Sequence, residues 1–120
     1  MLRSFSLAAA TAGVLALGAT AAAAGPAAHA SRSCAPPKYP GQGYFTSLQV
    51  AHVSCATGRK VTLAHYRCRI KHGRKGRCGR VLHYRCTEGA RRSIPTEYTS
   101  RVTCKRGARK VVYTYEQFLD

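Results

Sequence analysis

Six cysteines limit most strongly what this 120-residue chain can fold into. They are Cys34, Cys55, Cys68, Cys78, Cys86 and Cys104. An even number of cysteines in a short chain is typical of a disulfide framework. The chain has no Cys-x-x-Cys pair, which argues against structural zinc. We therefore expect three disulfides and no metal. Each bridge would stabilise the fold by about 2–4 kcal/mol, because it constrains the unfolded chain.

Six cysteines can pair in 15 ways, and one pair is favoured by its surroundings. Cys68 and Cys78 enclose a short segment that contains Gly73 and Gly76. Glycine accepts backbone conformations that let a chain turn back on itself. The sequence therefore predicts a local bridge between Cys68 and Cys78.

The other four cysteines leave two sets of pairs open. Cys86 and Cys104 lie symmetrically about Pro95, as in two strands of a hairpin with a wide loop. A bridge between them would leave Cys34 to pair with Cys55. In the competing set, Cys55 pairs with one of the hairpin cysteines and Cys34 pairs with the other.

Residues 1–30 have the three parts of a secretory signal peptide. Arg3 supplies a positive start, Leu7 to Leu17 is a short uncharged apolar run, and residues 28–30 have the small-x-small form of a cleavage site. A second cleavage site could follow Ala24. The sequence therefore predicts a secreted, extracellular protein, cell-wall associated in one version of this interpretation. No transmembrane segment is expected after cleavage.

The part that follows the signal peptide has a small apolar core and a large positive charge. The whole chain carries a formal net charge of +16, and Arg3 is the only charged residue among the first 30. The remaining 90 residues therefore hold 19 basic and 4 acidic side chains, but only 15 Val, Ile, Leu and Phe. So few large aliphatic residues in a highly charged chain are typical of disorder. Folding must therefore depend on the cysteines and on the seven tyrosines.

The pattern of apolar residues divides the mature chain into a Pro/Gly-rich N-terminal arm, residues 31–43, and a basic domain, residues 44–120. In the domain we expect the following elements: a strand from Tyr44 to Val53, a helix from Cys55 to about Arg67 capped by Ser54, a basic loop over 69–80, a strand from Val81 to Cys86, a polar connection over 87–96, a strand from Tyr98 to Cys104, a tight turn over 105–108, and a strand from Lys110 to Phe118. The order strand-helix-strand-strand-strand predicts an α+β fold, with the helix packed on an antiparallel sheet.

Three segments form a series that resembles a known group of proteins. They are residues 53–57 (Val-Ser-Cys-Ala-Thr), residues 84–86 (Tyr-Arg-Cys) and residues 102–112, which begin with Val-Thr-Cys-Lys-Arg-Gly-Ala and end with Val111-Val112. The series resembles small exported proteins of high-GC Gram-positive bacteria, over about residues 44–115. These proteins share the Ser-Cys-Ala-Thr helix start and the closing Val-x-Cys-x-x-Gly hairpin. They usually carry Ala where this chain has Gly58, and the loop closed by Cys68 and Cys78 is an addition here. The resemblance implies export and a fold, but no particular activity.

The densest group of cations lies around the loop that follows the predicted helix, and no Asp or Glu occurs between Cys55 and Thr87. Basic clusters of this spacing bind sulfated or phosphorylated polymers, and a bridged loop would lose less entropy on binding. We therefore predict a non-catalytic binding module for polyanions such as a cell-wall polymer, extracellular nucleic acid or acidic head groups. The predicted binding residues are Arg67, Arg69, Lys71, Arg74, Lys75, Arg77, Arg80, Lys105, Arg106, Arg109 and Lys110.

Two other functions fit the residue types less well. A membrane-active cationic toxin or antimicrobial protein would have the charge and the disulfides, but no long basic amphipathic helix is evident. A small secreted ribonuclease would need a carboxylate base, a histidine acid and an arginine at the phosphate. The candidates for these roles are Glu88 or Glu97, His65 or His83, and Arg85 or Arg101. We expect no enzyme activity, no cofactor, and a polyanionic polymer or surface as the partner.

Overall fold

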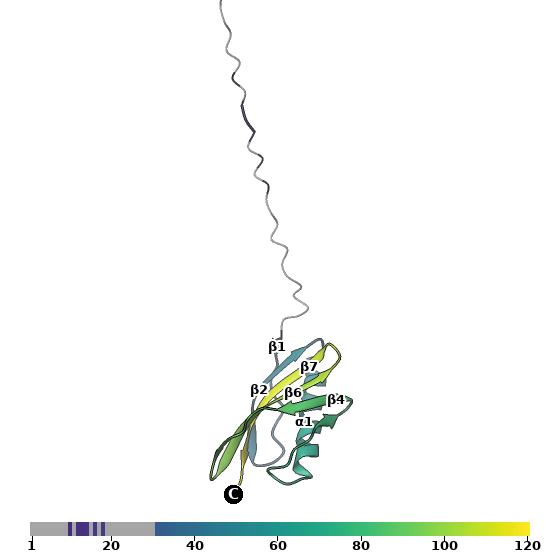
Figure 1. Cartoon of the computed structure of the whole chain (residues 1–120), viewed down its shortest axis with the longest axis vertical. Helices are drawn as coiled ribbons and strands as arrows, with labels where there is room; N and C mark the ends of the chain where they lie inside the picture. The colour runs from purple at the N-terminus through teal and green to yellow at the C-terminus, as the bar shows by residue number, and fades with distance from the viewer. Residues whose placement is uncertain (1–9, 11, 15, 17, 19–30) are drawn as a thin grey trace, which may run out of the picture.

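The computed structural model describes residues 10, 12–14, 16, 18 and 31–120. Most of the predicted signal peptide, residues 1–30, lies outside the described residues. Residues 31–120 form an α+β fold in which one helix packs on an antiparallel sheet of long and short strands (Figure 1). The predicted fold class is therefore confirmed.

Within residues 31–120, seven strands and one helix follow each other. They are β1 (Arg32–Ser33), β2 (Gly43–Ala51), α1 (Cys55–Ile70), β3 (Arg80–Val81), β4 (Tyr84–Glu88), β5 (Arg92–Ile94), β6 (Glu97–Arg106) and β7 (Arg109–Phe118). The strands are ordered β1-β2-β7-β6-β4-β3 across the sheet, and β5 pairs with β6 beyond the end of β4. The long strands β2, β6 and β7 form the centre of this sheet.

The predicted order of elements omits three short strands, β1, β3 and β5. The largest error concerns the predicted strand from Val81 to Cys86, which is in fact two strands joined by a tight turn. Val81 pairs with Tyr84, and the two residues between them, Leu82 and His83, have positive φ angles of 48° and 64°. Strand alternation alone does not reveal this turn, because such two-residue turns normally contain Asn or Gly.

The helix begins where its sequence predicts. The Ser54 side chain accepts a hydrogen bond from the backbone N–H of Thr57 at 3.1 Å, as an N-cap residue does. The helix ends at Ile70 rather than near Arg67, so its last turn takes in part of the predicted loop. Gly58 is buried, and a Cβ atom there would lie 2.4 Å from Cγ1 of Val50. Glycine therefore lets α1 approach β2 closely.

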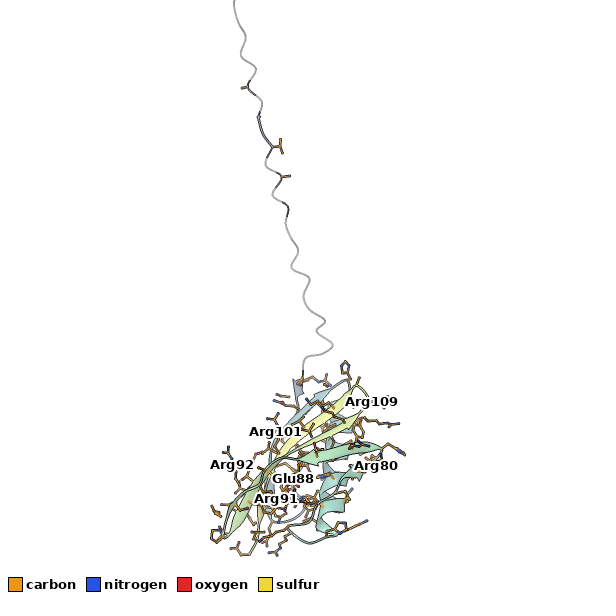
Figure 2. All side chains as sticks on the ribbon, viewed as in Figure 1. Arg80, Glu88, Arg91, Arg92, Arg101 and Arg109 are labelled. Carbon is orange, nitrogen blue, oxygen red and sulfur yellow. A yellow bond between two sulfur atoms is a disulfide. The ribbon has the colours of Figure 1, made fainter. Side chains whose placement is uncertain are left out.

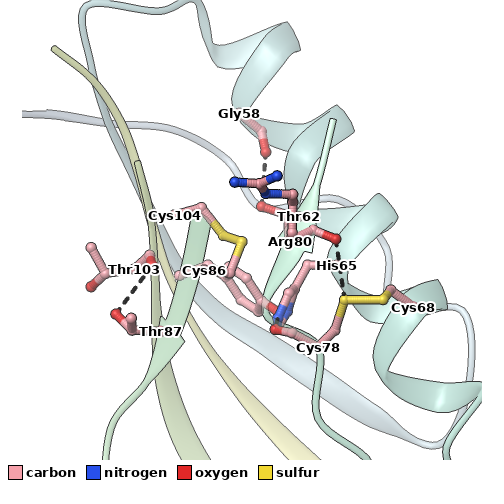
Figure 3. The surroundings of a disulfide bond; sticks show 11 residues. Gly58, Thr62, His65, Cys68, Cys78, Arg80, Cys86, Thr87, Thr103 and Cys104 are labelled. Atoms are coloured by element: carbon pink, nitrogen blue, oxygen red, sulfur yellow. Dashed lines mark hydrogen bonds between the residues drawn. A yellow bond between two sulfur atoms is a disulfide. The ribbon is translucent and has the colours of Figure 1, made fainter. Parts of the chain in front are cut away.

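Three disulfides connect the elements, and one of the two predicted sets of pairs is confirmed. Cys34 pairs with Cys55, Cys68 with Cys78, and Cys86 with Cys104. They tie the N-terminal arm to the start of α1, the end of α1 to the following loop, and β4 to β6; Figure 3 shows the last two bridges. Three disulfides are typical of extracellular proteins.

The core lies between the helix and one face of the sheet. Strand alternation places Leu48 and Val50 of β2, Val102 and Cys104 of β6, and Tyr113 and Tyr115 of β7 on this inner face, and all of them are buried. Tyr39, Tyr84 and Tyr98 are buried as well. Tyrosine rings thus supply much of the volume that few aliphatic side chains are present to fill.

Candidate anion-binding surface

The face of the sheet that points away from the helix carries a row of cations. Arg80 pairs in register with Arg85, Arg85 with Lys105, and Lys105 with Lys110, across β3, β4, β6 and β7. We call these four residues the cation row. Arg85, Lys105 and Lys110 follow or precede the inward-facing Cys86, Cys104 and Val111, so alternation directs them to the outer face.

Like charges directly opposite each other destabilise a sheet, so the cation row raises the free energy of the unliganded fold. Arg80, Arg85 and Lys105 are exposed, and Lys110 is half-buried. Neighbouring strands lie about 4.8 Å apart, so the row spans about 14 Å across the sheet. Such a row presents closely spaced positive charges on a firm support.

The carboxylates of the domain lie elsewhere. Glu88 belongs to the inner face and pairs with Arg77 at 3.5 Å and Arg91 at 2.9 Å. Glu97 lies at the far end of β6, about 27 Å along the strand from Lys105, and Glu116 pairs in register with Thr99, about 20 Å from Lys105. A hydrogen bond between these two carboxyl groups raises the pKa of Glu97. The described part of the chain therefore provides no ion pair to the cation row.

The basic loop, which we define as residues 71–79, is held to the core through its backbone carbonyl groups. The carbonyl oxygen of Arg74 accepts hydrogen bonds from the Tyr98 hydroxyl at 2.6 Å and from Nη1 of Arg69 at 3.2 Å. The carbonyl oxygen of Cys78 lies 2.9 Å from Nε2 of His65. With its carbonyls bound inward, the loop is less free to move than an open charged loop would be.

Arg91 adds two further attachments to the same loop. Its Nη1 donates to the carbonyl of Lys75 at 2.7 Å, and its Nη2 donates to the carbonyl of Gly76 at 2.8 Å. Glu88 orients this guanidinium by accepting from its Nε at 2.9 Å and from Nη2 at 3.1 Å. Burial opposes ionisation of Glu88, but hydrogen bonds from Arg91 and Tyr115 lower its pKa overall. The carboxylate therefore stays charged and holds Arg91 in the position from which it binds the basic loop. We call Glu88 and Arg91 together the loop anchor.

The structure corrects the sequence analysis at Arg69, which was predicted to face outward with the other cations. Arg69 is 0% exposed. Its guanidinium donates to the hydroxyls of Tyr39 at 2.8 Å and Tyr98 at 2.9 Å, and its Cζ lies 4.1 Å from the centre of the Tyr115 ring. The helix continues through this position, and the 3.6-residue period turns Arg69 toward the sheet. It therefore cannot contact an external polymer.

The buried groups around Arg69 are kept neutral. Burial raises the pKa of Tyr39 to about 12 and raises the pKa values of Tyr113 and Tyr115 further. Burial also lowers the pKa of His65, which forms a hydrogen bond with the Tyr113 hydroxyl through Nδ1. The Arg69 guanidinium is thus enclosed by neutral aromatic and amide groups. Its hydrogen bonds to them fix the position of the end of α1.

The remaining predicted binding residues divide into three places. Five of them are exposed at the end of α1 or on the basic loop: Arg67, Lys71, Arg74, Lys75 and Arg77. Arg80, Lys105 and Lys110 belong to the cation row. Arg106 and Arg109 are paired with each other at the end of the β6–β7 hairpin, on the helix side of the sheet. Figure 2 shows Arg109 at the upper right of the domain and Glu88 next to Arg91 near its centre.

Two further cations, Arg85 and Lys60, lie near these groups and are not among the predicted binding residues. Arg85, the centre of the cation row, was considered only as a ribonuclease residue. Its place between Tyr84 and Cys86, both buried, is the signal that identifies it as an outward residue. Lys60 of α1 was not singled out, and it lies near Arg106 and Arg109. Only the packing of the helix against the hairpin reveals that proximity.

The residues considered for ribonuclease chemistry lie in separate places. His65 is buried and bound to Tyr113 and Cys78, whereas His83 is exposed in the turn between β3 and β4. Glu88 is part of the loop anchor, and Glu97 lies at the far end of the sheet. Arg85 and Arg101 face outward, on the side of the sheet opposite Glu88.

No family model, curated protein or solved structure matches the chain. Within residues 31–120 and the few described before them, no group of three or more His, Cys, Asp or Glu could hold a metal ion. In the same part of the chain, no helix is both long and apolar enough to cross a membrane.

Proposed function

We propose that residues 31–120 form an exported, non-catalytic module that binds polyanions through the cation row and the basic loop. The observation that carries this proposal is the register of Arg80, Arg85, Lys105 and Lys110. Cations scattered over a surface lie too far apart to repel each other strongly. Four cations in register on adjacent strands do repel each other, and they lower the stability of the fold. A bound chain of phosphate or sulfate groups would remove that repulsion.

The basic loop supports the same function by a different route. Its carbonyl groups are bound by Arg69, Arg91, Tyr98 and His65, and the disulfide Cys68–Cys78 ties its C-terminal end to α1. The exposed side chains of Arg74, Lys75 and Arg77 therefore project from a backbone that is already ordered. Binding then costs less conformational entropy than it would for a free loop.

The chemistry of the ligand follows from the side chains. Arginine forms paired hydrogen bonds with phosphate or sulfate, and lysine adds point charges. Binding would occur mainly by release of counterions, so it would weaken steeply as salt is added. We infer a phosphate-bearing polymer or surface outside the cell as the target, with no reaction performed on it.

Retention on a phosphate or heparin resin tests this function. We expect the wild-type protein to elute at high salt. The triple variant Arg85→Gln, Lys105→Gln, Lys110→Gln should elute at clearly lower salt, and so should the loop variant Arg74→Ser, Lys75→Ser, Arg77→Ser. The matched control loses three exposed cations from other places, through Arg32→Gln, Lys38→Gln and Arg92→Gln.

The control separates a localised surface from general positive charge. If the control elutes as early as the two test variants, only net charge matters and the assigned surface is wrong. If the loop variant alone is retained like the wild type, the loop does not take part.

A further inference from the structure

A groove of about 350 Å³ lies on the helix side of the molecule. It lies between the first half of α1, the turn between β3 and β4, and the end of the β6–β7 hairpin, and it is open to solvent. Its walls include Lys60, Val61, Leu82, Tyr84, Arg106 and Arg109. Because Arg106 and Arg109 alternate with Lys105 and Lys110, this groove and the cation row lie on opposite sides of the hairpin.

Leu82 forms an apolar wall of the groove, and its exposure and backbone conformation both lower the stability of the fold. It is 47% exposed, and its φ of 48° lies in the left-handed region that non-glycine residues rarely adopt. His83, the next residue, has a φ of 64°. Backbone conformations of this kind are held in place by the surrounding structure and occur preferentially at functional sites. A turn that served only to connect β3 with β4 would be better formed by Asn-Gly.

The rim of the groove is positively charged without compensation. Arg106 and Arg109 lie directly opposite each other, and Lys60 approaches from α1. The ion pairs of the described residues join Glu88 to Arg77 and Arg91 only, so none of the three rim cations takes part in one. No acidic residue is among the residues that line the groove. The aliphatic stems of the three cations extend the apolar surface beside Leu82.

We propose that this groove binds a small amphipathic anion, a single phosphate or carboxylate head group on a short aliphatic chain. The head group would contact Lys60, Arg106 and Arg109, and the chain would lie along Leu82 and the stems. The volume is at the lower end of the range of small-molecule sites, which fits one short chain rather than a polymer. This site is distinct from the polyanion surface, and it requires an apolar contact that the cation row does not offer.

Three probes separate the two parts of the recognition: octyl phosphate, inorganic phosphate and octyl glucoside, each below the concentration at which it forms micelles. Binding is measured by calorimetry and by amide chemical-shift changes at residues 82 and 83. We expect octyl phosphate to bind at least about tenfold more tightly than either of the others, because it alone has both the charge and the chain. If inorganic phosphate or octyl glucoside binds as tightly, the proposal is wrong.

Leu82→Asn tests the apolar wall without disturbing the turn, because Asn adopts positive φ readily. We expect this variant to bind octyl phosphate at least about fivefold more weakly, with an unchanged affinity for inorganic phosphate. The control Ile94→Asn removes an exposed apolar side chain elsewhere and should bind as the wild type does. Arg106→Gln combined with Arg109→Gln should weaken octyl phosphate but leave octyl glucoside unchanged. Unchanged octyl phosphate binding by Leu82→Asn would overturn the assignment.

The two proposals fail separately. The triple variant of Arg85, Lys105 and Lys110 should keep its octyl phosphate binding while it loses retention on the resin. Leu82→Asn should show the opposite pattern. A single variant that abolishes both activities would mean that one general positive field accounts for both.

Discussion

Lys105 of β6 lies directly opposite Lys110 of β7 on the outer face of the sheet. Arg85 of β4 continues the same line on the other side of Lys105. Three adjacent strands thus place positive charges beside each other, where neutral side chains would avoid the repulsion. The arrangement lowers the stability of the free protein, and it suits a ligand that carries a line of negative charges.

Neutral side chains in the cation row should stabilise the free protein. We expect Lys105→Gln to raise the free energy of unfolding by about 0.5 kcal/mol at low salt, because it removes repulsion from Arg85 and Lys110. In urea titrations the gain should disappear at 1 M NaCl, where the screening length is only about 3 Å. Arg92→Gln, which pairs with Thr99 instead, should show no such gain. A Lys105 variant that is less stable at low salt would contradict the account of the row.

Arg69 should be essential to the fold and not merely to binding. Arg69→Met would remove the donor to the hydroxyls of Tyr39 and Tyr98 and would leave the carbonyl of Arg74 with the Tyr98 hydroxyl as its donor. We expect a loss of at least about 2 kcal/mol in the free energy of unfolding, because buried polar groups without partners are costly. Arg67→Met, on the exposed side of the same helix, should change it by less than about 0.5 kcal/mol. Equal stability of the two variants would show that the buried charge is dispensable.

The Arg69 cluster also marks the limit of what the sequence predicts. The α+β class, the N-cap at Ser54 and the bridge between Cys68 and Cys78 follow from local patterns, because capping, turning and alternation depend on neighbouring residues. The end of the helix does not follow from local patterns, because a run of cations suggests a loop. Arg69 can be buried only because tyrosines from strands distant in the sequence bind its guanidinium. The cation row is likewise a property of strand register, which joins residues up to 30 positions apart.

Stability should fall as the pH drops through the range where histidine titrates. Burial lowers the pKa of His65 in the folded protein below the ordinary 6.5, so the unfolded chain binds the proton first. The contribution of His65 is therefore complete above about pH 6.5 and decreases as the pH falls below it. Unfolding by urea from pH 8 to pH 5 measures this. His65→Gln should remove this part of the decrease, whereas His83→Gln, in an exposed turn, should retain it.

The backbone of the basic loop should tolerate a methyl group at one glycine and not at another. A Cβ atom at Gly76 would lie 2.1 Å from the carbonyl oxygen of Arg69, whereas one at Gly79 would have no atom within 4 Å. We expect Gly76→Ala to lower the free energy of unfolding by about 2 kcal/mol, because the backbone has to shift. Gly79→Ala should be neutral or stabilising by up to about 1 kcal/mol. If both substitutions were harmless, the loop would not be held as the hydrogen bonds indicate.

The salt dependence of binding to poly(U) tests the central claim most directly. A plot of log affinity against log salt has a slope that reports the number of phosphate contacts, about 0.7 for each on a single strand. We predict that Arg85→Gln, Lys105→Gln and Lys110→Gln together reduce this slope by about 2, while the control that removes Arg32, Lys38 and Arg92 leaves it nearly unchanged. An unchanged slope for the row variant, or an equal reduction for the control, would contradict the proposal that the cation row binds polyanions.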